Sequence, residues 1–179
     1  MLLVFALMTS PAVAEPWFLH RFGELRSYHG DWLAVCAENG QGACRAVQLP
    51  VDPAGDRFFV NRRLALHVGK DGNHVVEVFA RDLAPRGDSP ILFRTEDEVI
   101  AVDFGDWHAG APNLPNLAET ISVTNPMVAR DLVSLFRRDW RLKVGFKRND
   151  LGSGRAVFSL RGVTAALDAI ATHMASRLP

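Results

Sequence analysis

Residues 30–48 read GDWLAVCAENGQGACRAVQ and contain both cysteines of the chain, Cys36 and Cys44. Runs able to form strands flank a turn-like insert at 38–42, where Asn-Gly and a second Gly supply the positive-φ positions of a tight reversal. The pattern therefore predicts a β-hairpin in which the two cysteines face each other. A disulfide between them predicts a compartment outside the reducing cytosol.

Two other interpretations of the cysteines have less support. Common zinc sites use close C-x-x-C pairs, whereas Cys36 and Cys44 are eight positions apart and no histidine follows them nearby. His29 lies close to Cys36 in sequence, but a catalytic thiol also needs an orienting partner and a site for the transition state, and the sequence shows neither. We therefore expect a disulfide and no metal site.

The N-terminus has the anatomy of a secretory signal peptide. An apolar run at 1–8, too short to span a bilayer, precedes Ala12-Val13-Ala14, which fits the small-residue rule for cleavage. No Lys or Arg precedes the run, which leaves open a different true start or a buried strand of a cytosolic domain. We expect residues 1–14 to be a signal peptide, Glu15 to be the mature N-terminus, and the protein to be periplasmic, extracellular or at the cell surface, without a membrane span.

Composition favours one domain with no general affinity for polyanions. Twenty basic and twenty acidic residues give no net charge, so nucleic acid and anionic membranes are not expected partners. Asp139 interrupts the cations at 137–138 and at Arg141 and Lys143, and helix ends attract cations, so we expect a solvated helix end there. Residues 15–29 are expected to be a leader that packs loosely or pairs at a sheet edge, before a single β-rich domain over 30–179.

The body of the chain predicts mostly β-structure. Strand-forming runs lie at 58–68, 74–80, 91–94, 99–104, 141–147 and 155–160, with turn residues at 69–73 and 149–154. Glycine, proline and asparagine between 106 and 116 predict a surface loop. We expect a mainly β fold, an antiparallel β-sandwich-like domain with one central helix and a C-terminal amphipathic helix.

Two segments follow helical periodicity. Asn125 is placed to cap a helix with Pro126 at its first position, and apolar residues then recur at 128, 132, 135 and 136. Near the C-terminus apolar residues recur at 163, 166, 167, 170 and 174. This second pattern predicts an amphipathic helix whose narrow apolar stripe docks on the sheet.

The order of these features resembles the invasion-associated locus B family of exported bacterial proteins. One matching motif is 30–36 with 44–48, a tryptophan, two cysteines and a strand ending near Gln; the other is 158–167, a closing strand, a glycine and a helix. Many members carry a second cysteine pair before the central helix, where this chain has ISVTNP at 121–126. The resemblance implies a periplasmic or surface-exposed β-rich domain, named for an association with host-cell entry, with no catalytic residues to carry over.

An Arg86-Gly87-Asp88 tripeptide between two prolines resembles the integrin-binding tripeptide of animal adhesion proteins. A turn with Gly87 at its apex can present a cation and a carboxylate, and a carboxylate suits a metal ion held by a receptor. The same residue types also make up ordinary turns. We retain Arg86, Gly87 and Asp88 as a candidate binding loop, with adhesion as the hypothesis.

One further group of side chains has chemical potential. Asp103, Asp106 and His108 combine carboxylates with an imidazole, which can bind a metal or act as acid and base. A strand end followed by a polar loop explains them more simply, so we expect no catalytic residue and no metal ligand. Large aromatic side chains in or beside the strand runs are expected to pack in the core or to be partly buried: Trp32, Trp107 and Trp140.

These observations predict a non-enzymatic exported domain that binds an unidentified protein partner in the envelope or at a host surface, without a cofactor. The alternatives are a periplasmic enzyme and a structural component of the envelope. An enzyme needs a concave pocket that gathers titratable side chains from distant strands, whereas a binding domain needs an exposed apolar or loop patch.

Overall fold

The computed structural model describes residues 16–48, 62–84, 89–110, 119–148 and 152–177. Over these ranges the chain forms an eight-stranded and a four-stranded antiparallel sheet with two α-helices. The predicted mainly β fold with antiparallel sheets, a central helix and a C-terminal helix is confirmed. The elements in chain order are β1 (Phe18–Leu19), β2 (Leu25–His29), β3 (Trp32–Cys36), the 3₁₀ turn η1 (Glu38–Gly40), β4 (Cys44–Gln48), β5 (Arg62–Val68), β6 (His74–Ala80), β7 (Ile91–Arg94), β8 (Val99–Val102), β9 (Trp107–Ala109), β10 (Thr120–Val123), α1 (Pro126–Arg138), β11 (Arg141–Lys147), β12 (Ser153–Ser159) and α2 (Val163–Ala175).

The large sheet runs in the order β1-β2-β3-β4-β5-β6-β10-β9. Its first six strands follow the chain, so each pairs with its sequence neighbour. The edge strand β1 and its neighbour β2 lie in the segment expected to be a leader, which pairs at the sheet edge, one of the two arrangements expected for it. On this edge the ring of Phe18 stacks on that of Tyr28, with centroids 5.8 Å apart.

The small sheet runs in the order β12-β11-β7-β8. Strand β11 lies at its centre and pairs with β12 along seven residue pairs and with β7 through three. Because alternate residues of a strand point to opposite faces, β11 directs Leu142, Val144 and Phe146 into the core and leaves the residues between them on the outer face.

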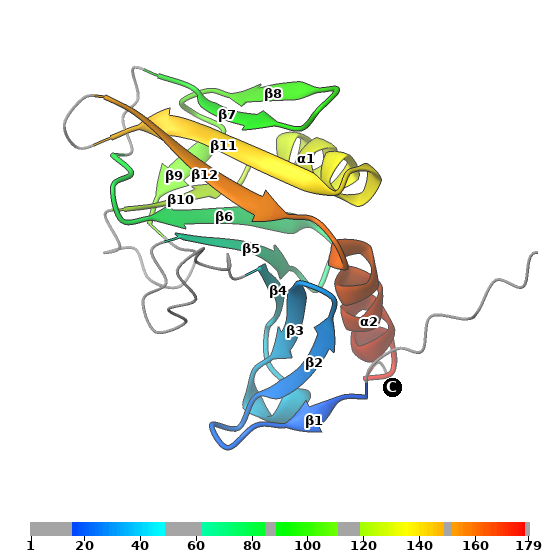
Figure 1. Cartoon of the computed structure of the whole chain (residues 1–179). Coiled ribbons are helices and arrows are strands. Elements are labelled where there is room, and N and C mark those ends of the chain that lie inside the picture. Colours follow the sequence, from blue (N-terminus) through cyan, green and yellow to red (C-terminus); the bar gives the residue numbers. More distant parts are fainter. Residues whose placement is uncertain (1–15, 49–61, 85–88, 111–118, 149–151, 178–179) are drawn as a thin grey trace, which may run out of the picture.

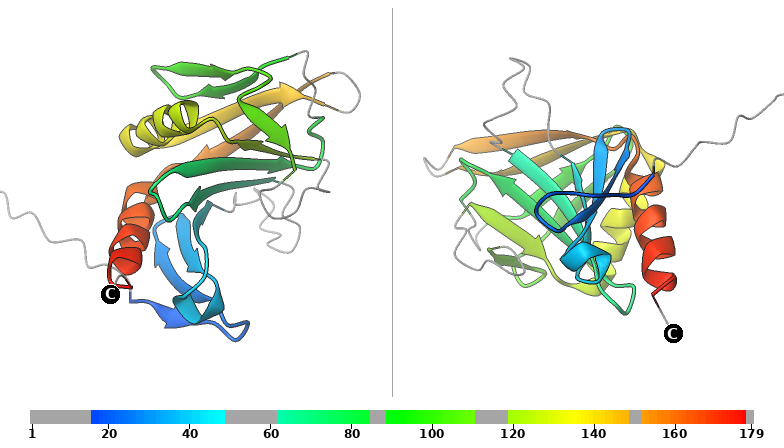
Figure 2. Two further views of the ribbon diagram at one scale, coloured as in Figure 1. Left: turned by 180° about the vertical axis from the view of Figure 1, so that it is seen from behind. Right: turned by 90° about the horizontal axis from the view of Figure 1, so that it is seen from below.

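The two sheets and two helices enclose a single hydrophobic core. Figure 1 shows the small sheet above β5 and β6, with α1 between the sheets at one end and α2 against β2–β4, and Figure 2 gives the same arrangement from behind and from below. The core cluster draws on both sheets and both helices, and includes the buried rings of Trp32, Phe93, Phe136 and Phe158. None of the helices in the described ranges is long and apolar enough to cross a membrane.

Helix α1 begins where its sequence signals place it. The side chain of Asn125 accepts a hydrogen bond from the N–H of Met127 at 3.0 Å, and Pro126 occupies the first turn. The predicted apolar face is buried at Leu132, Leu135 and Phe136 and packs on β6. The helix thereby fills the space between the two sheets at one end of the core.

Helix α2 starts at a very close backbone contact. Gly162 precedes it with a φ of +98°, and a Cβ at this position would lie 1.9 Å from the carbonyl oxygen of His29. The neighbouring turn is held by the Asp31 N–H, which donates to the Arg161 carbonyl at 3.1 Å. The indole N–H of Trp32 donates to the Ser159 carbonyl at 3.0 Å, and these bonds join the small sheet and α2 to the large sheet.

Three details differ from the sequence-based expectations. The segment predicted as a loop from 106 contains β9, because its residues pair with β10 across the sheet. Strand β10 itself was not predicted. In the hairpin turn, Glu38, Asn39 and Gly40 have positive φ, whereas the second glycine, Gly42, does not. The predicted positive φ at Asn39 and Gly40 is confirmed, and the third such position is Glu38 in a short 3₁₀ segment and not Gly42.

Candidate functional site

The hairpin of β3 and β4 carries the predicted disulfide. Cys36 and Cys44 are direct cross-strand partners with Cα atoms 4.1 Å apart, and they are joined by a disulfide. The side chains are 0% and 2% exposed. A buried disulfide at the end of a hairpin constrains the fold and offers no accessible thiol, which fits a structural role.

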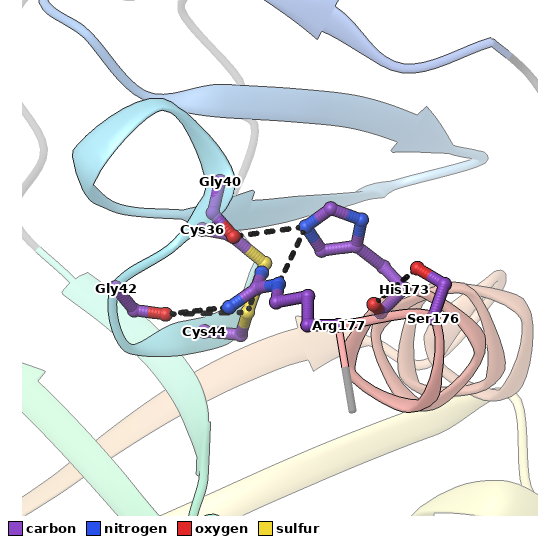
Figure 3. Close-up of a disulfide and its surroundings, with 7 residues drawn as sticks. All are labelled: Cys36, Gly40, Gly42, Cys44, His173, Ser176 and Arg177. Atoms are coloured by element: carbon purple, nitrogen blue, oxygen red, sulfur yellow. Dashed lines mark hydrogen bonds between the residues drawn. A yellow bond between two sulfur atoms is a disulfide. The ribbon is translucent and has the colours of Figure 1, made fainter. Parts of the chain in front are cut away.

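The last turn of α2 and the residues that follow it close over this hairpin, as Figure 3 shows. Arg177 donates from Nη1 to the Gly42 carbonyl at 3.0 Å, and its Nη2 lies 3.1 Å from the Cys44 sulfur. The Nε2 atom of His173 lies 3.0 Å from both the Gly40 carbonyl and the Arg177 Nε. Since arginine only donates, Nε2 accepts from Arg177 when it is unprotonated and donates to Gly40 when it carries the proton. We call these residues the hairpin clamp.

Of the candidate acid and metal residues, Asp106 has a clear structural role. Asp106 accepts a hydrogen bond from the Asn125 side chain at 2.6 Å, and its carbonyl accepts from the N–H groups of Thr124 and Asn125, so it braces the start of α1. Asp103 lies in the turn after β8, and His108 lies in β9. Within the described part of the chain no three His, Cys, Asp or Glu side chains are grouped to hold a metal ion.

A buried carboxylate that no sequence motif indicates lies on the outer face of the large sheet. Glu77 of β6 is 3% exposed, accepts from Arg63 at 2.6 and 2.9 Å, and lies 2.9 Å from the His67 ring. Burial raises the pKa of Glu77, but the hydrogen bonds and charges of His67 and Arg63 outweigh it and leave the pKa below its ordinary value. Since Glu77 on β6 pairs with Arg63 and His67 on the neighbouring strand β5, this cluster stabilises the sheet.

The Arg86-Gly87-Asp88 loop lies outside the described residues, so adhesion through it stays a prediction from the sequence.

The three tryptophans considered in the sequence differ in exposure. Trp32 and Trp107 are 1% and 3% exposed and pack in the core, whereas Trp140 is 51% exposed and only partly buried. Trp140 lies between the end of α1 and the start of β11, at the surface.

Trp140 stands where two surface hollows meet. The first, of about 560 Å³, extends from Trp140 and Arg141 to the acidic β7–β8 turn at 95–98. The second, of about 380 Å³, extends from the same two residues to Asp31 and Arg161. An exposed tryptophan between two hollows offers a large rigid contact area at low cost in conformational entropy. We call this region the Trp140 groove.

Charged neighbours hold the tryptophan in place. The guanidinium carbons of Arg141 and Arg161 lie 6.0 and 5.8 Å from the centre of the Trp140 ring. The Asp139 carboxylate accepts from the N–H groups of Trp140 at 2.7 Å and Arg141 at 3.3 Å. Burial raises the pKa of Asp139, but hydrogen bonds from Trp140, Thr95 and the neighbouring backbone hold it below its ordinary value. The groove can therefore bind a partner by stacking and by charge.

Comparison with known proteins defines the class of fold. No protein-family model matches the sequence, and no curated protein sequence matches it. The chain shares the fold of a solved invasion-associated protein, with a TM-score of 0.58 over 83% of this chain and 96% of the other. That structure is the crystal structure of invasion associated protein B from Bartonella henselae, which is 17% identical to this chain. The resemblance seen in the sequence is thus confirmed at the level of the fold.

Proposed function

We propose that this chain is an exported, non-enzymatic binding protein of the invasion-associated locus B type, which works in the periplasm or at the cell surface. Its partner is a component of the envelope or of a host surface. The shared fold with invasion associated protein B supports the type. The disulfide supports an oxidising compartment.

The observation that carries the binding function is the Trp140 groove. A half-exposed tryptophan costs solubility and adds little to the core, and such residues are enriched where binding energy concentrates. Among the described residues in and beside the groove, Asp139 is the one whose pKa is displaced, and its hydrogen bonds explain the lowered pKa. The groove therefore supports contact with a partner better than acid–base chemistry.

Binding of the labelled full chain to isolated envelopes and to animal cells tests this function. We expect saturable binding that falls at least about tenfold in Trp140→Ala, the loss typical of a hot-spot residue. Met127→Ala is the matched control, since Met127 is 63% exposed on α1 outside the groove, and it should bind like the parent chain. Equal binding by Trp140→Ala and the parent would reject the groove as the contact surface.

The location is tested by the intact mass of protein from its bacterial host, before and after reduction with thiol alkylation. We expect a chain beginning at Glu15 that gains two alkyl groups only after reduction. A full-length chain with both thiols free would contradict export. A chain that stays with the cell wall or membrane during fractionation, with no binding to purified partners, would favour a structural component of the envelope instead.

A further inference from the structure

The outer face of the small sheet is strongly basic although the whole chain has no net charge. The register places on this face alternate residues of β7, β8, β11 and β12. None of these outward positions is acidic. Five of them are basic: Arg94, Arg141, Lys143, Lys147 and Arg155. We call this surface the cationic face; it adjoins the Trp140 groove through Arg141.

None of these five cations forms an ion pair with another described residue, whereas several other described cations do. The ion pairs found there use other cations, such as Arg63, Arg137 and Arg138. Lys143 and Arg94 are even direct cross-strand partners, and like charges in this position destabilise a sheet. An arrangement that weakens the fold without a compensating contact indicates a surface kept for a partner.

A hollow opens in the middle of the cationic face. It measures about 550 Å³ and is lined by Arg94, Lys143 and Arg155 over a floor formed partly by Leu92 and Gly145. Packing does not require glycine at this position, since a Cβ on Gly145 would meet its nearest neighbour, the Leu92 Cβ, at an ordinary 3.7 Å. Glycine within a strand often marks a close approach by a ligand. Here it leaves bare backbone between three cations.

We propose that the cationic face binds an acidic polysaccharide, with its sulfate, phosphate or carboxylate groups on the cations and one group seated in the hollow over Gly145. Outward residues repeat along β11 at about 6 to 7 Å, so Arg141, Lys143 and Lys147 present a row of charge to an extended chain. Trp140 at the end of this row offers a ring on which a sugar can stack. This inference rests on the proposed binding function and names the chemistry of the partner.

The other polyanions fit the cationic face less well. An anionic membrane is usually entered by several protruding Trp, Phe or Leu side chains. On this face Leu92 and Val157 are partly buried, and the exposed apolar side chains among the described residues are Val99 on β8 and Trp140 beside β11. Single-stranded nucleic acid needs several aromatic rings for successive bases, and the described part of this surface has only Trp140. Binding to both of these polyanions is measured beside binding to the polysaccharide in the test below.

The test is a titration of the full, oxidised chain with heparin, a sulfated polysaccharide, at low and at moderate salt. We expect saturable binding that weakens steeply with salt and is absent for neutral dextran. Lys143→Glu with Arg155→Glu should weaken it by about tenfold or more. The control pair Lys70→Glu with Arg130→Glu makes the same charge change at exposed positions elsewhere and should bind like the parent.

Gly145→Val separates a shaped site from a diffuse patch, because it fills the hollow and leaves every charge in place. We expect it to weaken heparin binding while the thermal midpoint stays unchanged or rises. Full affinity in Gly145→Val, equal losses in both charge pairs, or no binding by the parent chain would overturn the inference. Tighter binding to phosphatidylglycerol vesicles or to single-stranded DNA than to heparin would overturn it as well.

Failure of this inference is distinct from failure of the proposed function. If heparin does not bind but Trp140→Ala still abolishes binding to envelopes or cells, the acidic polysaccharide is rejected and the binding function stands. If Trp140→Ala leaves that binding intact, the groove is rejected whatever the heparin result.

Discussion

The hairpin clamp and the cationic face use arginine in opposite ways. In the clamp, Arg177 is partly buried and its N–H groups reach a carbonyl, a ring nitrogen and a disulfide sulfur. On the cationic face, Arg94 lies across from Lys143 without a carboxylate partner among the described residues. The first arrangement satisfies its donors within the molecule and so supports folding. The second leaves its charge available to another molecule.

Residues that stabilise the fold and residues available for binding therefore lie in different parts of the molecule. Large losses of stability are expected at the junction of α2 with the large sheet and at the disulfide hairpin. Changes on the cationic face are expected to leave the free energy of unfolding nearly constant. The predictions below run from the largest expected loss to none.

The first prediction concerns the backbone contact at Gly162. Gly162→Ala should destabilise the protein by about 3 kcal/mol or more, because the new Cβ meets the His29 carbonyl and the residue also has positive φ. Gly72→Ala is the matched control, with a φ of +79° but no atom within 4 Å, and should cost about 1 to 2 kcal/mol. Chemical denaturation measures both. Equal losses in the two variants would show that the close contact does not matter.

The second prediction concerns the disulfide. Replacing Cys36 and Cys44 together by Ala should lower the free energy of unfolding by roughly 2 to 3 kcal/mol, the loop-closure entropy of so short a segment. The comparison is made between the oxidised parent and the double variant under non-reducing conditions. An unchanged midpoint would mean that the clamp from α2 holds the hairpin without the covalent bond.

The third prediction contrasts a buried cluster of paired charges with an exposed ion pair. Glu77→Gln should cost roughly 1 to 2 kcal/mol at neutral pH, since it leaves partly buried donors without their carboxylate. Glu98→Gln, which breaks an exposed pair with Arg138, should cost less than about 0.5 kcal/mol.

The pH dependence of the Glu77 cluster follows from its pKa. The folded-state pKa lies below the ordinary 4.5, so the carboxylate stabilises the fold above pH 4.5 and that stabilisation is lost as the pH falls through the folded-state value. The difference in unfolding free energy between the parent and Glu77→Gln should therefore shrink on acidification below pH 4.5. A difference that grows in acid would contradict the assigned direction.

Sequence patterns predicted the elements whose signals are local. Strands β6 and β11 occupy the predicted residues 74–80 and 141–147, and α1 begins at its Asn125 cap. These segments have an unbroken alternation of apolar residues or a recognised helix cap, and the contacts they make in the folded protein bury the faces that these patterns predict. The disulfide was predictable for the same reason, because its two cysteines flank one turn.

The missed features depend on contacts between distant segments. Strands β9 and β10 are short, and they form because each pairs with another strand of the large sheet. Trp140 was expected to be in the core or partly buried because it lies beside a strand run, and its place between α1 and β11 leaves 51% of it exposed. The alternation of cations along β11 is visible in the sequence. Their clustering with Arg94 and Arg155 depends on the pairing of β11 with β7 and β12, which the sequence pattern does not specify.

The most direct test of the separation between folding and binding is the unfolding free energy of Lys143→Gln, measured by chemical denaturation beside the parent chain. Removing one of two opposed like charges should leave this free energy unchanged or raise it by up to about 0.5 kcal/mol. A fall of more than about 1 kcal/mol, the size of a lost hydrogen bond, would show that Lys143 stabilises the sheet and would contradict the account of the cationic face.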